Sequence, residues 1–189
     1  MSTLHRIGKN ERKWNNMNHQ AHKVAGVCAG TITATLLYHN DIQSGNGLIA
    51  IVPIIAGGYL GALLPDIDHP GSKIGRALYP VAWVVNKLFG HRGATHSLLA
   101  LFLTSVLFIL PSLKLTGFAG FMYTQFAIGV AVGFLSHLIL DMSTKSGVPL
   151  LHPFTRKSFR IAKLTTGKHD MFVSVLAVAL TATTVLLMV

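Results

Sequence analysis

Five long apolar stretches, separated by polar connections, dominate the pattern along the chain. They run approximately over residues 24–38, 47–64, 97–110, 117–140 and 171–189. Stretches of this kind are typical of transmembrane helices, which need about 20 residues to cross the hydrocarbon core. Because the first and third stretches are short, their polar ends are expected at the membrane boundary. The pattern therefore predicts an all-α polytopic membrane helix bundle with about five transmembrane helices.

One further segment, residues 74–89, combines helical periodicity with basic and polar flanks. Its apolar positions recur at helical spacing and comprise Ile74, Leu78, Val81, Val85 and Leu88. This predicts an amphipathic helix that lies in the membrane interface. Glycines in the second and fourth apolar stretches, which predict close helix packing, are Gly57, Gly58, Gly61, Gly129 and Gly133.

Composition supports a membrane protein and adds an orientation. Charged residues make up 12% of the chain and its mean hydropathy is +0.53. All but one of the 16 lysines and arginines lie in the N-terminal arm or in the connections after the second and fourth stretches, leaving only Lys114 for the other side. The positive-inside rule then predicts a multi-pass inner-membrane protein with a cytoplasmic N-terminus and an external C-terminus. The basic residues flank apolar runs and form no stripe, so lipid is the expected partner and no nucleic acid is indicated.

The division into domains is simple. Residues 1–18 form a polar, basic N-terminal arm without the features of a signal peptide, and residues 19–189 are expected to form a single membrane-embedded domain. Cys28 is the only cysteine, which excludes an internal disulfide and a cysteine-based zinc site. Its place in an apolar run favours a buried packing role.

Histidines and aspartates gather where the predicted helices meet the cytoplasmic face. The candidate metal ligands are His22, Asp66, His91, His96, His137 and Asp141. His137 and Asp141 share a helix face because they are four residues apart. Imidazole with carboxylate suits zinc, manganese or iron, and the number of ligands exceeds the four that one zinc takes. We therefore expect divalent metal ions, most simply zinc, and two or more of them.

Other polar residues near these helix ends are weaker candidates. Possible ligands or supporting residues are His69, Ser97 and Ser136, and a basic run that could bind a phosphate or headgroup is Arg156, Lys157 and Arg160. Each feature has a simpler explanation, since interfacial histidines are often only polar tips and basic runs often only set topology. We interpret His5, His19, His39 and His169 as such polar tips. Because four separate helix ends bring histidine or aspartate to the same face of the membrane, we favour the metal site over these simpler explanations.

The motifs that carry this chemistry resemble those of the YdjM family of inner-membrane proteins. The matching segments are 63–70 (LLPDIDHP), 90–98 (GHRGATHSL) and 133–137 (GFLSH) leading to Asp141, with His22 as the isolated N-terminal histidine. The family is described as membrane-bound metal-dependent hydrolases, so the resemblance implies that activity. More remotely, the order of His and Asp is similar to that of zinc-dependent phospholipase C and the S1/P1 nucleases. This remote likeness implies phosphoester hydrolysis at a lipid surface.

Three functions remain open at this point. The first is a hydrolase of a phosphoester or phospholipid, in which Asp68 is a ligand or the general base and Arg92 stabilises developing charge. The second is a metal transporter, which would need ionisable groups deeper in the membrane than the sequence offers. The third is a non-catalytic membrane protein whose metal site only holds the helices together.

Overall fold

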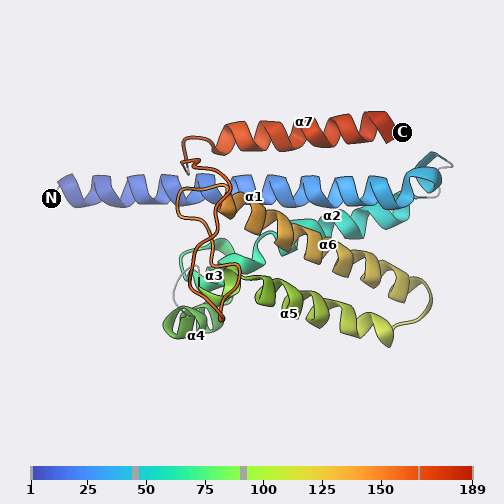
Figure 1. Cartoon of the computed structure of the whole chain (residues 1–189), viewed down its shortest axis with the longest axis horizontal. Helices are drawn as coiled ribbons and strands as arrows, with labels where there is room; N and C mark the ends of the chain where they lie inside the picture. Colours follow the sequence, from blue (N-terminus) through green and yellow to red (C-terminus); the bar gives the residue numbers. More distant parts are fainter. Residues whose placement is uncertain (1, 44–46, 90–92, 166, 189) are drawn as a thin grey trace.

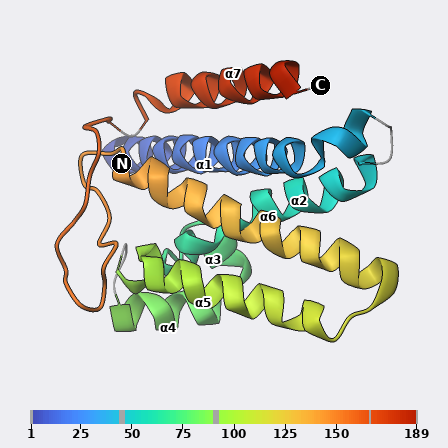
Figure 2. The same cartoon turned by 45° about the vertical axis from the view of Figure 1, so that its right-hand side comes forward.

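The described part of the chain is a bundle of helices. The computed structural model describes residues 2–43, 47–89, 93–165 and 167–188, with side chains left out at 2–18, 42–43, 48 and 89. The long elements are α1 (Ser2–Gln43), α2 (Leu48–Gly61), α5 (Leu98–Ile109), α6 (Gly117–Met142) and α7 (Asp170–Met188). They run along one axis in alternating directions (Figures 1 and 2). Within the described ranges the only extended pairing is two isolated bridges, so the all-α prediction is confirmed.

Short elements collect at one end of the bundle. Between α2 and α5 the chain forms the 3₁₀ helix η1 (Leu64–Asp68), α3 (Lys73–Ala77), α4 (Tyr79–Phe89) and the 3₁₀ helix η2 (Ala94–His96). The connection from α6 to α7 folds back over the same end (Figure 2). At the opposite end, the 3₁₀ helix η3 (Leu110–Leu113) leads from α5 to α6.

The helix expected over residues 74–89 is interrupted. α3 ends at Ala77, and Leu78 leaves the helical conformation before α4 begins. Pro80 explains the break, because proline lacks the backbone N–H that would bond to residue 76 and its ring crowds the preceding turn. Large apolar side chains of α4, among them Val81, Trp83 and Leu88, are exposed. That exposure suits a helix in the membrane interface, and its placement there stays a prediction.

Length and composition identify fewer candidate membrane spans among the described residues than the five that the sequence predicts. Within the described residues, three helical segments are long and apolar enough to cross a membrane: Ile49–Asp68, Gly117–Met142 and Asp170–Met188. The apolar helix Leu98–Leu113 is shorter. The prediction of five spans is therefore not confirmed, although α1 packs against α2, α6 and α7, and α5 packs against α6 (Figure 1). The backbone of the polar arm, residues 2–18, continues α1.

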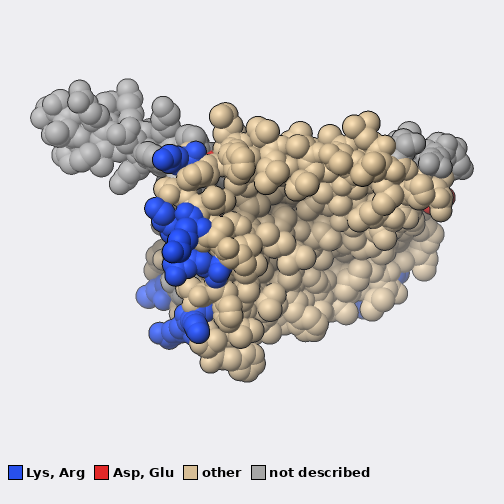
Figure 3. Space-filling model, turned by 45° about the horizontal axis from the view of Figure 1, so that its top comes forward, with Lys and Arg blue, Asp and Glu red and all other residues tan. Residues whose placement is uncertain are grey.

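Basic residues are concentrated at the end of the bundle that carries the short elements. Figure 3 shows lysines and arginines gathered there. They belong to α1, as Lys23, and to the segments between α2 and α5 and between α6 and α7, whereas Lys114 lies at the opposite end, after η3. The predicted orientation depends on this distribution of basic residues. That this end faces the cytoplasm stays a prediction.

Glycines bring α1, α2 and α6 into close contact, as the sequence predicts. A β-carbon on Gly133 of α6 would overlap the carbonyl oxygen of Gly58 in α2, and one on Gly61 would overlap that of Val130. Gly26 of α1 approaches Gly58 in the same way. Because these backbones touch, the ends of the three helices are fixed relative to one another.

The contact at Gly133 leads to a stability prediction. Replacing Gly133 with alanine should destabilise the bundle by about 1–3 kcal/mol, because the backbone of α2 would have to move. A fluorogenic thiol reagent can measure this, since Cys28 is buried and is exposed only on unfolding. The matched control is Leu135→Ala on the exposed face of the same helix, which should change the melting temperature less. An unchanged melting temperature for Gly133→Ala would contradict the close approach.

Candidate metal centre

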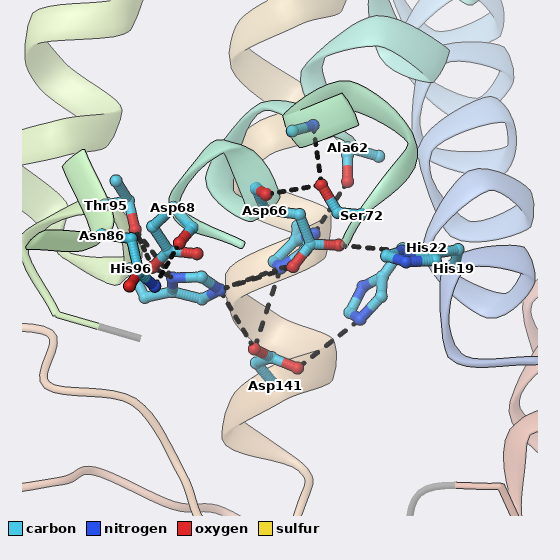
Figure 4. Close-up of polar contacts among 12 residues, drawn as sticks. His19, His22, Ala62, Asp66, Asp68, Ser72, Asn86, Thr95, His96 and Asp141 are labelled. Carbon is cyan, nitrogen blue, oxygen red and sulfur yellow. Dashed lines mark hydrogen bonds and ion pairs between the residues drawn. The ribbon is translucent and has the colours of Figure 1, made fainter. Parts of the chain in front are cut away.

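Four elements bring histidine and aspartate side chains together at the end with the short elements. α1 contributes His22, η1 contributes Asp66, η2 contributes His96, and the last turns of α6 contribute His137 and Asp141. Figure 4 shows the side chains from α1, η1 and η2 pointing toward Asp141. His96 and His137 are 0% exposed and Asp141 is 1% exposed. Polar groups this deeply buried require partners, so their mutual arrangement decides what the cluster can do.

The backbone and a hydroxyl fix the orientation of two imidazole rings. The Nδ1 of His137 donates to the carbonyl oxygen of Ala62, 2.7 Å away. A carbonyl can only accept, so Nδ1 carries the hydrogen and Nε2 presents its lone pair. Thr95 donates its hydroxyl hydrogen to Asp68 at 2.6 Å, which leaves its oxygen to accept from Nδ1 of His96 at 3.0 Å. His96 therefore also presents Nε2 to the cluster.

The presented atoms form a compact triangle. The Nε2 atoms of His96 and His137 are 3.3 Å apart. Oδ2 of Asp141 lies 3.4 Å from the first and 3.7 Å from the second. Oδ1 of Asp66 faces the same two nitrogens at 4.0 Å and 3.9 Å. Two imidazole nitrogens with their lone pairs directed at each other repel unless a cation lies between them.

Some of these separations are close to those of a metal site. With zinc–nitrogen distances of about 2.0–2.1 Å, neighbouring ligand atoms of a tetrahedral site are about 3.3 Å apart. The two imidazoles and Asp141 fit a divalent ion in both chemistry and spacing, whereas Asp66 supplies a suitable oxygen that lies farther away, at 3.9–4.0 Å. The second nitrogen of each ring bonds to the protein, which is the usual way to hold a ligating histidine.

The two carboxylates also reach toward α1. Asp141 turns its Oδ1 to Nε2 of His22 at 3.5 Å, and Asp66 turns its Oδ2 to Nδ1 of His19 at 3.1 Å. The His22 ring stacks on the His137 ring with centroids 3.8 Å apart. Each carboxylate therefore faces the His96–His137 pair with one oxygen and an α1 histidine with the other. Carboxylates placed in this way are suited to a site that holds more than one ion.

Asp68 lies behind His96. Its Oδ2 is 3.4 Å from Nδ1 of His96, on the side of the ring away from the cluster. Asn86 of α4 donates to the Asp68 carbonyl oxygen at 2.7 Å, which ties this turn to α4. Ser72 donates to the carbonyl oxygen of Asp66 at 2.8 Å and accepts from the backbone N–H of Gly75. The loop after α2 is thereby fixed so that Asp66 reaches the cluster.

The remaining sequence candidates are placed elsewhere or are not described. Ser97 caps α5 by accepting from the N–H of Ala100, Ser136 donates to a carbonyl of its own helix, and Nδ1 of His69 accepts from Gly71. The basic run, which stays a predicted binding site, is exposed in the α6–α7 connection and comprises Arg156, Lys157 and Arg160. Two candidates, His91 and Arg92, lie outside the described residues.

Sequence reasoning missed His19 and Thr95. His19 was interpreted as a polar tip, yet it is bonded to Asp66. A signal was present, because His19 and His22 are three residues apart and share one helix face. Thr95 gave no comparable signal, since its role depends on how η2 places it between Asp68 and His96.

A comparison with protein families shows to which family the chain belongs. The model of the family described as YdjM inner membrane protein matches residues 17–189. The chain belongs to this family. The match contains the whole cluster, from His19 to Asp141, and it is consistent with an inner-membrane location.

Individual relatives support the assignment. The chain is 39% identical to inner membrane protein YdjM of Escherichia coli (strain K12) over 127 residues, which is 67% of this chain and 62% of the relative. A Shigella flexneri protein of the same name matches equally. The uncharacterized protein YvsG of Bacillus subtilis (strain 168) is 40% identical over 104 residues, or 55% of this chain and 59% of the relative. The chain thus spans about three fifths of these relatives, and no solved structure matches it.

Proposed function

We propose that this inner membrane protein is a metal-dependent hydrolase that cleaves a phosphoester, with a phospholipid as the favoured substrate class. The observation that carries the proposal is the pair of Nε2 atoms of His96 and His137, 3.3 Å apart and both presented as lone pairs beside two carboxylates. A cluster of this composition suits hydrolysis, because its ligands are those of zinc, manganese or iron.

Each residue of the cluster has a definite task in this proposal. His96, His137, Asp141 and Asp66 would hold the first ion, and His22 and His19 would complete a second position on the α1 side of the carboxylates. When bound, such ions activate water as a nucleophile and neutralise the charge of a phosphate. Asp68 is a positioning residue, because it contacts the far side of His96. His96, His137 and Asp141 are buried by the surrounding helices, which limits their contact with bulk water.

Two features favour an anionic lipid-like substrate over a soluble one. The cluster lies at the ends of apolar helices, where a membrane lipid exposes its phosphate. The same end is rich in lysine and arginine (Figure 3), including the exposed residues Arg156, Lys157 and Arg160. These cations would attract anionic groups to the entrance and hold them there.

Hydrolysis of defined phosphodiesters by the purified full chain tests the proposal. With zinc or manganese added, wild type should release nitrophenol from bis(p-nitrophenyl) phosphate or a phosphate-containing headgroup from mixed phospholipid micelles. Asp141→Asn should lower the rate at least about a hundredfold, since it weakens a carboxylate at the centre of the cluster. Asp41→Asn, at the opposite end of α1, is the matched control. If metal-loaded wild type cleaves none of these substrates, the proposed hydrolase function is wrong.

A structural metal site is the second candidate, and the deep burial of His96 and His137 favours it. Such a site would hold α1, η1, η2 and α6 together without reacting with a substrate. The two functions differ in a measurable way. A structural site predicts that metal removal lowers the melting temperature and that no phosphodiester is cleaved, whereas the hydrolase needs both metal and turnover.

The role assigned to Asp68 gives a separate prediction. Asp68→Asn should weaken metal affinity about 10–100-fold without removing a ligand, because His96 loses the carboxylate that orients it. Competition with a chromogenic chelator measures this change. Asn86→Ala is the control, since Asn86 contacts only the backbone of Asp68 among the bonds described. Complete loss of metal in Asp68→Asn would instead make Asp68 a direct ligand.

A further inference from the structure

A cavity of about 160 Å³ adjoins the metal centre on the side of α7. Its wall includes His22 of α1 and Asp141 of α6, so it reaches two residues of the cluster. The rest of the wall comes from α1, α6, the α6–α7 connection and the first turns of α7. The cavity therefore offers a route to ligands that are otherwise buried among helices.

Much of the cavity wall is apolar. Besides His22 and Asp141, it contains Leu140 of α6 and the α7 residues Phe172, Val173 and Leu176. Phe172 and Leu176 are more than two-fifths exposed on the apolar surface of α7. α7 packs against α1 (Figure 1), and the cavity separates its first turns from the end of α6. An apolar chain can thus enter from the hydrocarbon side.

Asp170 supplies a charged group in the same wall. Its Oδ1 accepts from the N–H of Gly167 at 2.9 Å. Its Oδ2 is buried, and among the described residues none donates a hydrogen bond to it. A buried carboxylate oxygen without a donor is costly. Because Asp170 lines the cavity, a cationic group on a ligand bound there would lie beside this carboxylate and be favoured by its charge.

We propose that this cavity binds a membrane lipid whose headgroup carries a primary ammonium next to its phosphate. The ammonium pairs with the carboxylate of Asp170, the phosphate lies toward His22 and Asp141, and an acyl chain lies against Phe172, Val173 and Leu176. This inference rests on the proposed function in taking His22 and Asp141 as the reacting end. It adds the substrate class and a headgroup-selecting residue, Asp170.

Competition between two lipids that differ only in the headgroup nitrogen tests the assignment. Native mass spectrometry of the detergent-purified full chain would compare phosphatidylethanolamine with phosphatidylcholine of identical acyl chains. Wild type should retain phosphatidylethanolamine about tenfold better, as expected for a charge-assisted hydrogen bond that the trimethylated nitrogen cannot make. Equal retention of the two lipids would overturn the proposal.

Two variants locate the effect. Asp170→Asn keeps the acceptor for the N–H of Gly167 but removes the charge. The ratio of retained phosphatidylethanolamine to retained phosphatidylcholine should therefore fall to near one. Val173→Trp fills the cavity and should reduce retention of both lipids. Asp41→Asn, an acidic residue at the other end of the bundle, is the control and should keep the preference. A preference that survives Asp170→Asn, or retention unchanged by Val173→Trp, would place the lipid elsewhere.

Metal content separates this inference from the proposed function. Asp170→Asn and Val173→Trp should bind as much zinc as wild type, because neither residue belongs to the cluster. Wild type that binds no zinc but prefers phosphatidylethanolamine would refute the hydrolase and leave the lipid site standing. Wild type that binds zinc and cleaves phosphodiesters without any lipid preference would refute the lipid site alone. The thiol-reagent melting curve of each variant confirms that it is folded.

Discussion

Replacing His137 with asparagine should release the bound metal while the bundle stays folded. Asparagine places an amide N–H near the position of Nδ1, so the hydrogen bond to Ala62 is kept. It has no atom in the place of Nε2, which faces His96, Asp141 and Asp66. Elemental mass spectrometry of detergent-purified protein should find about two ions per chain in wild type and less than one in the variant.

The matched control for this experiment is His39→Asn. His39 also bonds through Nδ1 to a backbone carbonyl, that of Met188, but at the opposite end of α1. It should therefore retain the full metal content. If His137→Asn keeps its metal, or if well-folded wild type binds none after zinc or manganese is added, the cluster is not a metal centre. The buried histidines and aspartates would then be hydrogen-bonded packing groups.

The cluster is the part of the molecule that the sequence predicts best. His22, Asp66, His96, His137 and Asp141 were chosen because each stands at the end of an apolar stretch on the same predicted side. The alternation of helix directions then carries all five to one layer, and the structure gathers them into two groups that share His137, with the ligand atoms of each group within 4.8 Å of one another. Their roles as ligands stay predictions until metal is measured.

The supporting contacts depend on chain conformations that the pattern does not specify. Ala62 accepts from His137 only because α2 ends beside α6, where Gly58 and Gly133 allow close approach. Thr95 lies between Asp68 and His96 because η2 is a short 3₁₀ turn. Asp170 faces the cavity because the α6–α7 connection folds back to α1, a long-range arrangement that hydrophobic periodicity does not encode.

In the fold, too, the local sequence pattern predicts the individual helices but not the contacts between distant segments. The apolar stretches predict the helices, but not every predicted helix is long enough to count as a candidate span, and Leu98–Leu113 is one of the shorter ones. Pro80 split the interfacial segment, and this local signal was present in the sequence. How α1 and α5 are positioned in the bilayer depends on their packing against α2 and α6, and therefore on contacts that no single helix determines.

Single cysteines should react with a membrane-impermeant thiol reagent from one side only, according to the end of the bundle where they lie. In a Cys28→Ser background, Ser158→Cys marks the end that carries the cluster and Thr116→Cys marks the opposite end. Both positions are exposed. Because lysine and arginine are concentrated at the first end, Ser158→Cys should react only in inside-out vesicles and Thr116→Cys only in right-side-out vesicles.

A third position tests the number of spans. Asp41→Cys, near the end of α1, should react from the same side as Thr116→Cys if α1, α2, α5 and α6 all cross the membrane. Reaction of Asp41→Cys from the cytoplasmic side would mean that α1 and α2 do not cross as a pair, leaving fewer than five spans. Reaction of Ser158→Cys from outside would reverse the orientation. The candidate metal centre would then face the external side, and the basic residues around it would have to be explained by substrate binding instead of topology.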